Sequence, residues 1–382
     1  MKTDKRKLRQ QKKIKKRIGI LIILFIVLLG YFVVNNQFVK GLYYKVNEPV
    51  HADNPTVSLH SSNSSNILNF KNMVILSSAN NVTAYNINGE IVETKLFSEI
   101  SASVSNFTDL QFKSCDDYVI AYDKNGVNLV VFGKGKEILP VDVKSKIVFA
   151  KPFNSGDFMV IAEHSVAKNQ VILYGNDGKE KYIWYSGVNN IIDAAYSSSE
   201  RRLTVISSDL STGNYNSKIL FFDIHKNSPY SEMTFENVLF TNVNYYNKEH
   251  LVVLGDCGTY YFNNDGELIN SYNFDNKMLS CYKQMPNGVM VLSFGSKSGN
   301  GTVVEIVGNK GQVMGHYETE NDIISVDFDN SNILLCELRR AVLITKGGHT
   351  VREINLNKDM QKAFFLKNRF ILIGNSEIRF VK

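Results

Sequence analysis

Histidine and cysteine, the side chains that most often bind transition metals, are scattered along this chain rather than grouped. The seven histidines are His51, His60, His164, His225, His250, His316 and His349, and the four cysteines are Cys115, Cys257, Cys281 and Cys336. They contain no HxxxH, HxH or CxxC spacing. The sequence therefore predicts no metal site and no cofactor, and it leaves open a disulfide between Cys257 and Cys281.

Carboxylates and glycines offer two further candidates for chemistry. Asp116, Asp117, Asp256 and Asp265 could supply oxygen ligands for calcium, but no EF-hand loop with its closing glutamate surrounds them. We expect these aspartates to be turn residues. The run GSKSGNGT from Gly295 resembles a phosphate-binding loop, but it joins two expected strands and opens no helix. Because the chain also lacks a GxSxG motif, we predict no catalytic residue and no enzyme.

The elements that position these residues follow a repeat. Eight similar apolar segments recur at intervals averaging about forty residues, the length of one four-stranded propeller blade. They are MVILSS from Met73, YVIAYD from Tyr118, FMVIAE from Phe158, LTVISS from Leu203, LVVLGD from Leu251, VMVLSF from Val289, ILLCEL from Ile333 and FILIGN from Phe370. Each is apolar on both faces, as expected of a middle strand buried between neighbouring sheets.

Further strands surround each apolar segment. A first strand with mixed faces precedes it, which suits a position lining a central channel, and a third strand follows it. Turns such as Asn88-Gly89, Asp177-Gly178 and Asp265-Gly266 then lead to a fourth strand, because both central residues of such turns tolerate positive φ. The sequence predicts an all-β fold, and no helix is expected in the propeller.

The number of blades depends on the two ends of this region. The last unit ends at Lys382 without a fourth strand, whereas TVSLH at Thr56–His60 has no partner of its own. We therefore predict that Thr56–His60 completes the last blade and that the protein is an eight-bladed β-propeller, since such closure removes exposed sheet edges. Seven blades are the alternative if the segment around Asn66–Phe70 forms no strand.

The N-terminal region is of a different kind. Residues 1–17 carry ten of the 43 Lys and Arg and one of the 37 Asp and Glu. The uncharged segment 18–34 would span about 25 Å as a helix. We expect a single transmembrane helix, with Ile18, Leu21, Phe25, Leu28 and Val34 among its membrane anchor residues. Its orientation is set by Lys12, Lys13, Lys15, Lys16 and Arg17, which place the tail in the cytoplasm. Residues 35–55 then form a stalk, and 56–382 form an extracytoplasmic propeller.

The segments AYNINGEIV from Ala84 and LYGNDGKEKYIWY from Leu173 resemble repeats of the quinoprotein-like (PQQ-like) β-propeller superfamily. The combination of basic tail, anchor and propeller also resembles an uncharacterised family of membrane-anchored propellers of Gram-positive bacteria. The first resemblance implies a quinone and calcium in enzymes of that superfamily, together with a disulfide between adjacent cysteines. This chain has no adjacent cysteines and only one tryptophan, Trp184, so the features of those enzymes are absent.

These observations favour a binding function. Outside the tail, 33 Lys and Arg stand against 36 Asp and Glu, so the propeller lacks the basic excess typical of nucleic-acid binding. We expect a membrane-anchored scaffold that contacts lipid through its helix and a protein or cell-wall partner through its loops. Aromatic residues such as Tyr245 and Tyr246 either fill the space between blades or form a binding stack. A quinoprotein-like enzyme with a cofactor in the channel and an envelope sensor are the alternatives.

Overall fold

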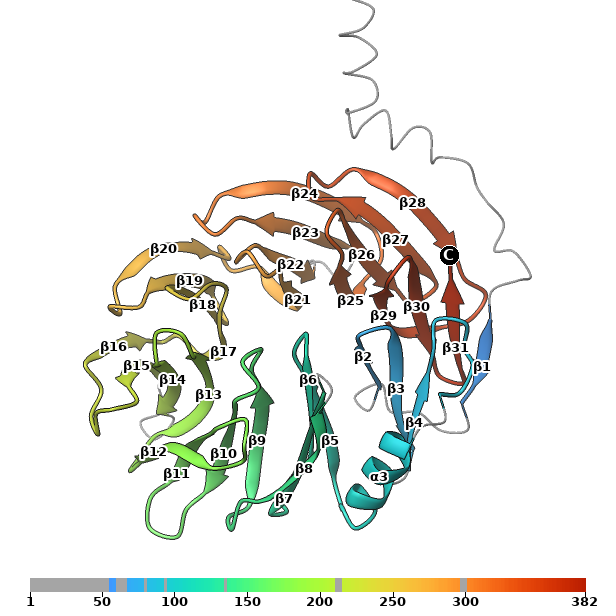
Figure 1. Ribbon diagram of the computed structural model, residues 1–382. Coiled ribbons are helices and arrows are strands. Elements are labelled where there is room, and N and C mark those ends of the chain that lie inside the picture. The colour runs from blue at the N-terminus through green and yellow to red at the C-terminus, as the bar shows by residue number, and fades with distance from the viewer. Residues whose placement is uncertain are drawn as a thin grey trace, which may run out of the picture.

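The described part of the chain contains eight β-sheets arranged in a ring (Figure 1). The computed structural model describes residues 55–59, 67–78, 81–92, 95–133, 136–209, 215–295 and 301–382. Seven sheets have four strands and one has three. Each sheet is one blade, and all neighbouring strands within it are antiparallel. The eight-bladed all-β propeller is thus confirmed, and the seven-bladed alternative is wrong because β2 (Ile67–Phe70) does form a strand.

The two inner positions of each blade match the repeat. The innermost strands are β2, β5 (Leu110–Ser114), β9 (Ile147–Pro152), β13 (Asn190–Ser197), β17 (Phe240–Tyr245), β21 (Met278–Gln284), β25 (Ile323–Phe328) and β29 (Met360–Leu366). The second strands are β3 (Met73–Ser78), β6 (Tyr118–Asp123), β10 (Phe158–Glu163), β14 (Arg202–Asp209), β18 (His250–Gly255), β22 (Met290–Gly295), β26 (Asn332–Glu337) and β30 (Arg369–Gly374). Every apolar segment of the repeat lies in a second strand, where neighbouring blades bury both of its faces.

The outer positions complete the sheets. The third strands are β4 (Asn81–Tyr85), β7 (Asn128–Gly133), β11 (Asn169–Tyr174), β15 (Asn216–Asp223), β19 (Gly258–Asn263), β23 (Thr302–Val307), β27 (Arg340–Thr345) and β31 (Glu377–Val381). The outermost strands are β8 (Lys136–Asp142), β12 (Glu180–Ser186), β16 (Ser231–Glu236), β20 (Leu268–Asn273), β24 (Val313–Thr319), β28 (Thr350–Asn355) and β1 (Thr56–Ser58). The apolar core is therefore distributed between adjacent blades, as in the cluster shared by β6, β7, β9, β10 and β11.

The two ends of the described chain close the ring, as the sequence predicts. Strand β1 pairs with β31, with Val57 opposite Ile378. The Leu59 amide donates a hydrogen bond to the Ser376 carbonyl over 2.7 Å. The Phe380 amide donates to the Pro55 carbonyl over 3.0 Å. This pairing gives the last blade its fourth strand and covers the edge that β31 would otherwise expose.

The first blade departs from the prediction that each turn leads to a fourth strand. After the turn at Asn88-Gly89 only an isolated bridge forms, between Tyr85 and Ile91. Helix α3 (Lys95–Val104) follows and packs beside β4. The Ser101 hydroxyl accepts a hydrogen bond from the Val82 amide over 3.0 Å and donates to its carbonyl over 3.2 Å. The helix thus protects a sheet edge that a strand protects in the other blades.

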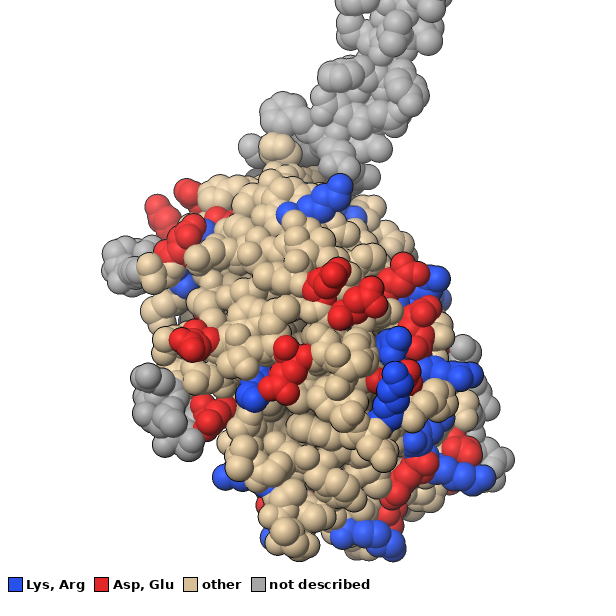
Figure 2. All heavy atoms as spheres, turned by 90° about the vertical axis from the view of Figure 1, so that its left-hand side faces the viewer, with Lys and Arg blue, Asp and Glu red and all other residues tan. Residues whose placement is uncertain are grey.

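The predicted membrane segment lies outside the described residues. Residues 1–17, 18–34 and most of 35–55 are among those that the structure does not describe, and with them the anchor residues Ile18 to Val34 and the cations Lys12 to Arg17. Within the described ranges, no helix has the length and apolar character needed to cross a membrane. The outer edge of the ring shown in Figure 2 carries interspersed acidic and basic side chains separated by uncharged surface.

Candidate functional site

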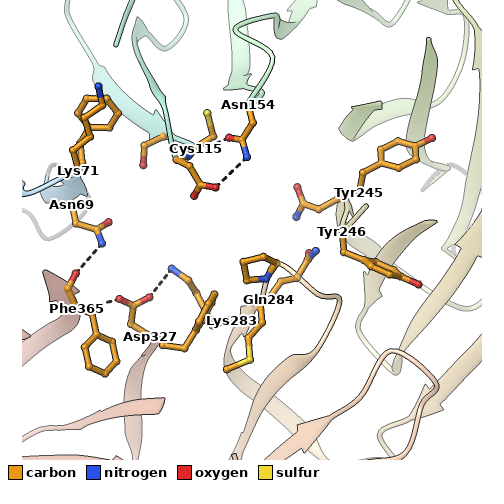
Figure 3. Close-up of a pocket in the computed structure, with 17 residues that line it drawn as sticks. Asn69, Lys71, Cys115, Asn154, Tyr245, Tyr246, Lys283, Gln284, Asp327 and Phe365 are labelled. Carbon is orange, nitrogen blue, oxygen red and sulfur yellow. Dashed lines mark hydrogen bonds and ion pairs between the residues drawn. The ribbon is translucent and has the colours of Figure 1, made fainter. Parts of the chain in front are cut away.

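The main candidate site is a pocket at one mouth of the central channel. Its volume is about 710 Å³, and its lining comes from seven of the eight blades. The lining residues lie at or just beyond the C-terminal ends of β2, β5, β9, β17, β21, β25 and β29. Figure 3 shows that these side chains surround a shared open space. A group bound here would contact nearly the whole ring at once.

Amide side chains dominate the rim of this mouth. Asn69, Asn154, Asn244 and Gln284 contribute amides, whereas the ring of Tyr246 points away from the opening and packs against His250 and Tyr261 (Figure 3). The Asn154 amide donates to the Asp116 carboxylate over 3.2 Å, and the Asp116 amide donates back over the same distance. Such a rim offers hydrogen-bond donors and acceptors in fixed positions, which suits recognition of a polar ligand.

Below the rim, one side of the channel carries a fully connected polar network (the paired side). The Lys151 ammonium lies 3.0 Å from the Asp193 carboxylate and also donates to the Val243 carbonyl over 3.0 Å. Asp193 further accepts hydrogen bonds from the Asn242 amide group and the Val243 backbone amide, each over 3.0 Å. The Asp193 side chain is only 3% exposed, so this network is a structural connection between β9, β13 and β17.

A second ion pair joins β21 to β25. The Lys283 ammonium lies 2.9 Å from Asp327, whose other oxygen accepts a hydrogen bond from the Phe365 amide over 2.8 Å (Figure 3). Lys283 is 44% exposed and reaches the open mouth, whereas Asp327 is 7% exposed. The cation of this pair is therefore accessible to a ligand, although its counter-charge is already present.

Two further lysines face the same channel with no carboxylate at ion-pair distance among the described residues (the unpaired side). Lys113 of β5 lies over the Phe149 ring, 5.4 Å from its centre. Lys362 of β29 donates to the Ile67 carbonyl over 3.2 Å. Burial lowers the pKa of both ammonium groups, and nearby lysines lower it further, whereas Asp193 raises the pKa of Lys113 and Asp327 raises that of Lys362.

The sequence candidates for metal chemistry are not brought together. Of the histidines, His51 and His60 lie outside the described residues, and none of the other five lines the mouth. Over the described ranges, no three His, Cys, Asp or Glu side chains are placed to hold a metal ion. Asp256 accepts a hydrogen bond from the Leu239 amide over 3.0 Å, so it is a turn residue as expected.

The cysteines are all free, so the disulfide that the sequence left open between Cys257 and Cys281 does not form. Cys336 is buried in the core, and burial raises the pKa of its thiol to about 12. Cys115 lines the mouth, but burial also raises the pKa of its thiol. Because the thiolate is the reactive form, the position of Cys115 does not make it a nucleophile at neutral pH.

The residues of the channel do not fit the quinone and calcium that the superfamily resemblance implies. Calcium prefers several carboxylate and carbonyl oxygens. Here both channel carboxylates, Asp193 and Asp327, are bound to lysines. The disulfide between adjacent cysteines is also missing from this chain. No chemical step through that cofactor follows from these residues.

The channel lysines were not predicted from the sequence. For Tyr245 and Tyr246, which could either pack between blades or form a binding stack, the structure shows packing: Tyr245 ends β17 and Tyr246 follows it at the mouth, but their rings lie against the core clusters between blades (Figure 3). A signal for the lysines was present, because Lys113, Lys151 and Lys283 are each the only charged residue of an innermost strand with mixed faces. A lone lysine in such a strand must point either to solvent or into the channel.

Comparison with known proteins supports the fold. The model of DUF5711, a family of unknown function, matches residues 51–382. No curated protein matches the chain in sequence. Among solved structures, BamB from Moraxella catarrhalis is 11% identical with a TM-score of 0.52, over 86% of this chain and 98% of that chain. The C-terminal WD40 domain of Sif2 is 10% identical with a TM-score of 0.59, over 85% and 97%. The quinohemoprotein alcohol dehydrogenase ADHIIG from Pseudomonas putida HK5 is 8% identical with a TM-score of 0.55, over 86% and 75%. These likenesses show the propeller fold alone.

Proposed function

The chain belongs to the DUF5711 family of unknown function, and from its channel we propose that it is a non-catalytic binding module tethered to the outside of the cell membrane. Its partner is a protein or a cell-wall polymer that docks at the mouth of the central channel. The observation that carries this proposal is the mouth itself, which is open, polar and built from seven blades. A closed ring holds such a rim rigidly, so little order has to be created on binding.

The chemistry of the mouth favours binding over catalysis. General acid–base and nucleophilic catalysis need a nucleophile within hydrogen-bond reach of a base. Asp327, the most buried acid at the mouth, accepts hydrogen bonds from Lys283 and the Phe365 backbone. The raised pKa of Cys115 keeps that thiol protonated at neutral pH. What is left at the mouth is a set of hydrogen-bonding amides and the accessible Lys283 cation.

The tether in this proposal is the segment 18–34, with the basic run 1–17 on the cytoplasmic side. The topology supports a particular orientation of the mouth. Strand β1 is antiparallel to β31, which runs in the same direction as β29, so Thr56 lies at the end where β29 finishes. The chain therefore enters the ring on the same side as the mouth. The mouth would then open toward the tether rather than away from it.

Site-specific crosslinking in intact cells tests the proposal. A photoreactive amino acid at Gln284 on the rim is expected to capture a defined partner. The matched control is Val166, which is 91% exposed in the loop between β10 and β11, outside the mouth. Capture from Gln284 and not from Val166 supports docking at the mouth. The same adduct from both sites, or adducts from Val166 alone, contradicts it.

The location has its own test. Protease added to whole cells is expected to digest the propeller and to spare an epitope placed within residues 1–17. Loss of that epitope with an intact propeller would reverse the orientation. Absorbance of a quinone in the purified protein would favour the enzyme alternative instead.

A further inference from the structure

The loops on the mouth side of the ring divide into a basic and an acidic half. These loops join the first to the second strand and the third to the outermost strand of each blade, and they include the turn after β4. In the four consecutive blades whose innermost strands are β21, β25, β29 and β2 (the basic half), their charged residues are Lys310, Lys346, Lys367, Lys71, Asp329 and Glu90. In the other four blades, the described residues of the same loops include more Asp and Glu than Lys and Arg.

Two lysines of the basic half have an unusual backbone conformation. Lys71 follows β2 and Lys367 follows β29, so they occupy equivalent turns, Lys71-Asn72 and Lys367-Asn368, in adjacent blades. Their φ angles are 54° and 57°. Glycine adopts positive φ readily and asparagine tolerates it, but in both turns the lysine adopts it and the asparagine that follows does not. A lysine that occupies a strained position twice indicates a function for its side chain.

The rest of the ring offers these two side chains no counter-charge. Both lysines are exposed, and neither has a carboxylate at ion-pair distance among the described residues. The Lys71 ammonium lies 5.2 Å from the centre of the Phe70 ring. Lys144, whose φ is 65°, differs, because it lies on the opposite face of the ring and is paired with Asp142. The ammonium groups of Lys71 and Lys367 are therefore available to a partner outside the ring.

The chain reaches the ring between the same two blades. The Pro55 carbonyl accepts a hydrogen bond from the Phe380 amide over 3.0 Å, and a β-carbon on Gly89, in the turn after β4, would lie 3.2 Å from that of Pro55. Pro55 thus lies where the last blade meets the first, on the mouth side (Figure 1). The segment 35–55, which joins it to the expected membrane helix, can span at most about 70 Å. The basic half is therefore the part of the mouth face closest to the attachment point.

We propose that the basic half of the mouth face lies against an anionic phospholipid surface, with Lys71 and Lys367 at the contact. This inference deepens the proposed function and rests on its tether. A lysine near an anionic bilayer favours the bound state about fivefold. Such a contact is weak alone, but the tether makes it intramolecular and gives it a high effective concentration. The same surface repels the acidic half, so the mouth remains open to a partner from that side.

Quenching by lipid headgroups tests this contact. The full-length chain is reconstituted in vesicles of phosphatidylcholine, either alone or with a third of phosphatidylglycerol, that contain a trace of lipid with a nitroxide on its headgroup. A fluorescent amino acid at Asn368 reports on the basic half, and one at Val166 reports on the opposite face. We expect more quenching at Asn368 than at Val166, an increase with phosphatidylglycerol, and a decrease as salt rises.

The variants Lys71→Asn and Lys367→Asn separate binding from folding, because asparagine tolerates positive φ. Each should lower the ratio of bound to free propeller about fivefold, and the double variant about twenty-fivefold, without lowering the thermal midpoint. The control is Lys144→Asn, which makes the same change at a similar φ on the opposite face and should leave quenching at Asn368 unchanged. Quenching at Asn368 that is equal in the two lipids, or unchanged in the double variant, would overturn the proposal.

The outcomes also distinguish this contact from the proposed function. A chain that does not sediment with phosphatidylcholine vesicles contradicts the tether. The comparison of wild type and double variant with phosphatidylglycerol still decides the contact, because residues 1–17 are the same in both proteins. Loss of crosslinking at Gln284 bears on docking at the mouth alone. If soluble polyphosphate binds the wild type but not the double variant, and quenching is equal in the two lipids, the lysines bind a wall polymer and the lipid contact is wrong.

Discussion

The paired and unpaired sides of the channel use the same residue types differently. On the paired side, Lys151 is 14% exposed and finds Asp193, a backbone carbonyl and an amide within 3.1 Å. On the unpaired side, Lys113 and Lys362 have no carboxylate at ion-pair distance among the described residues, and burial lowers the pKa of both ammonium groups. A buried cation whose hydrogen bonds are complete holds a fold together. A cation with fewer such bonds contributes less to the fold.

The largest effect should come from breaking the paired side. Asp193→Asn removes the counter-charge of Lys151 and turns a donor toward the Asn242 amide group and the Val243 amide. Because this leaves an uncompensated buried charge, the free energy of unfolding should fall by about 3–5 kcal/mol. Chemical denaturation measures it. Asp265→Asn, in an exposed turn, is the control and should change stability by less than about 0.5 kcal/mol.

Breaking the ion pair between Lys283 and Asp327 should reduce stability less. Asp327→Asn removes the counter-charge of Lys283, but that lysine is 44% exposed and its ammonium reaches water. The remaining cost comes mainly from the Phe365 amide, whose hydrogen bond weakens. We expect a loss of about 1–3 kcal/mol in the same denaturation assay. A loss as large as that of Asp193→Asn would show that the two pairs are equally structural.

The unpaired side should tolerate the loss of its charge. Lys113→Met keeps most of the side-chain volume and removes an ammonium group whose burial is unfavourable. The thermal midpoint should therefore stay level or rise slightly. A clear fall in the midpoint would mean that Lys113 is a structural cation like Lys151, and the distinction between the two sides would be lost.

The pH dependence of stability should be the smallest effect. Its sign shows whether the charges on Lys113 and Lys362 stabilise or destabilise the folded protein. The pKa of Lys113 and Lys362 in the folded protein is lowered from 10.5. Between the lowered pKa values and 10.5, the unfolded chain therefore holds more protons on these lysines than the folded protein does. The free energy of unfolding consequently increases as pH rises through that interval. The charged groups that act on the pKa of Lys113 are Asp193 and Lys151, and those that act on the pKa of Lys362 are Lys283, Asp327 and Lys113.

The measurement compares the wild type with the variant that lacks both lysines. Below the lowered pKa values, the wild type should be less stable than the variant that lacks both lysines. The difference in free energy of unfolding between the two proteins should shrink as pH approaches 10.5. A difference that is constant with pH would mean that neither lysine titrates in this way.

Much of the ring could be predicted because its signal is repeated. Eight buried second strands gave the period, and the missing outer strand of the last blade required Thr56–Ser58 to pair with Glu377–Arg379. The helix α3 was missed because the repeat led us to expect a strand there. Its own pattern was visible, since Phe97, Ile100 and Val104 follow helical spacing and are all buried.

The channel could not be predicted in the same way. The sequence places Lys113 and Lys362 on innermost strands, but they are nearly 250 residues apart in a chain of 382. Only closure of the ring brings their strands to either side of β2. Whether a lysine in a mixed strand has a carboxylate partner depends on the strand beside it, and that neighbour is fixed by tertiary structure.

The short strand β1 also has a mechanical consequence. Tension on the chain before Thr56 that pulls along β1 is parallel to the contact between β1 and β31. The few hydrogen bonds between Thr56–Ser58 and β31 then bear the force together, in shear, rather than one after another. These bonds are also the only ones that keep the first and last strands joined within the described ladder. A sufficiently strong force on the chain before Thr56 should separate β1 from β31 before it unfolds any other blade. The pairing of β1 with β31 is therefore the mechanically weakest connection of the ring.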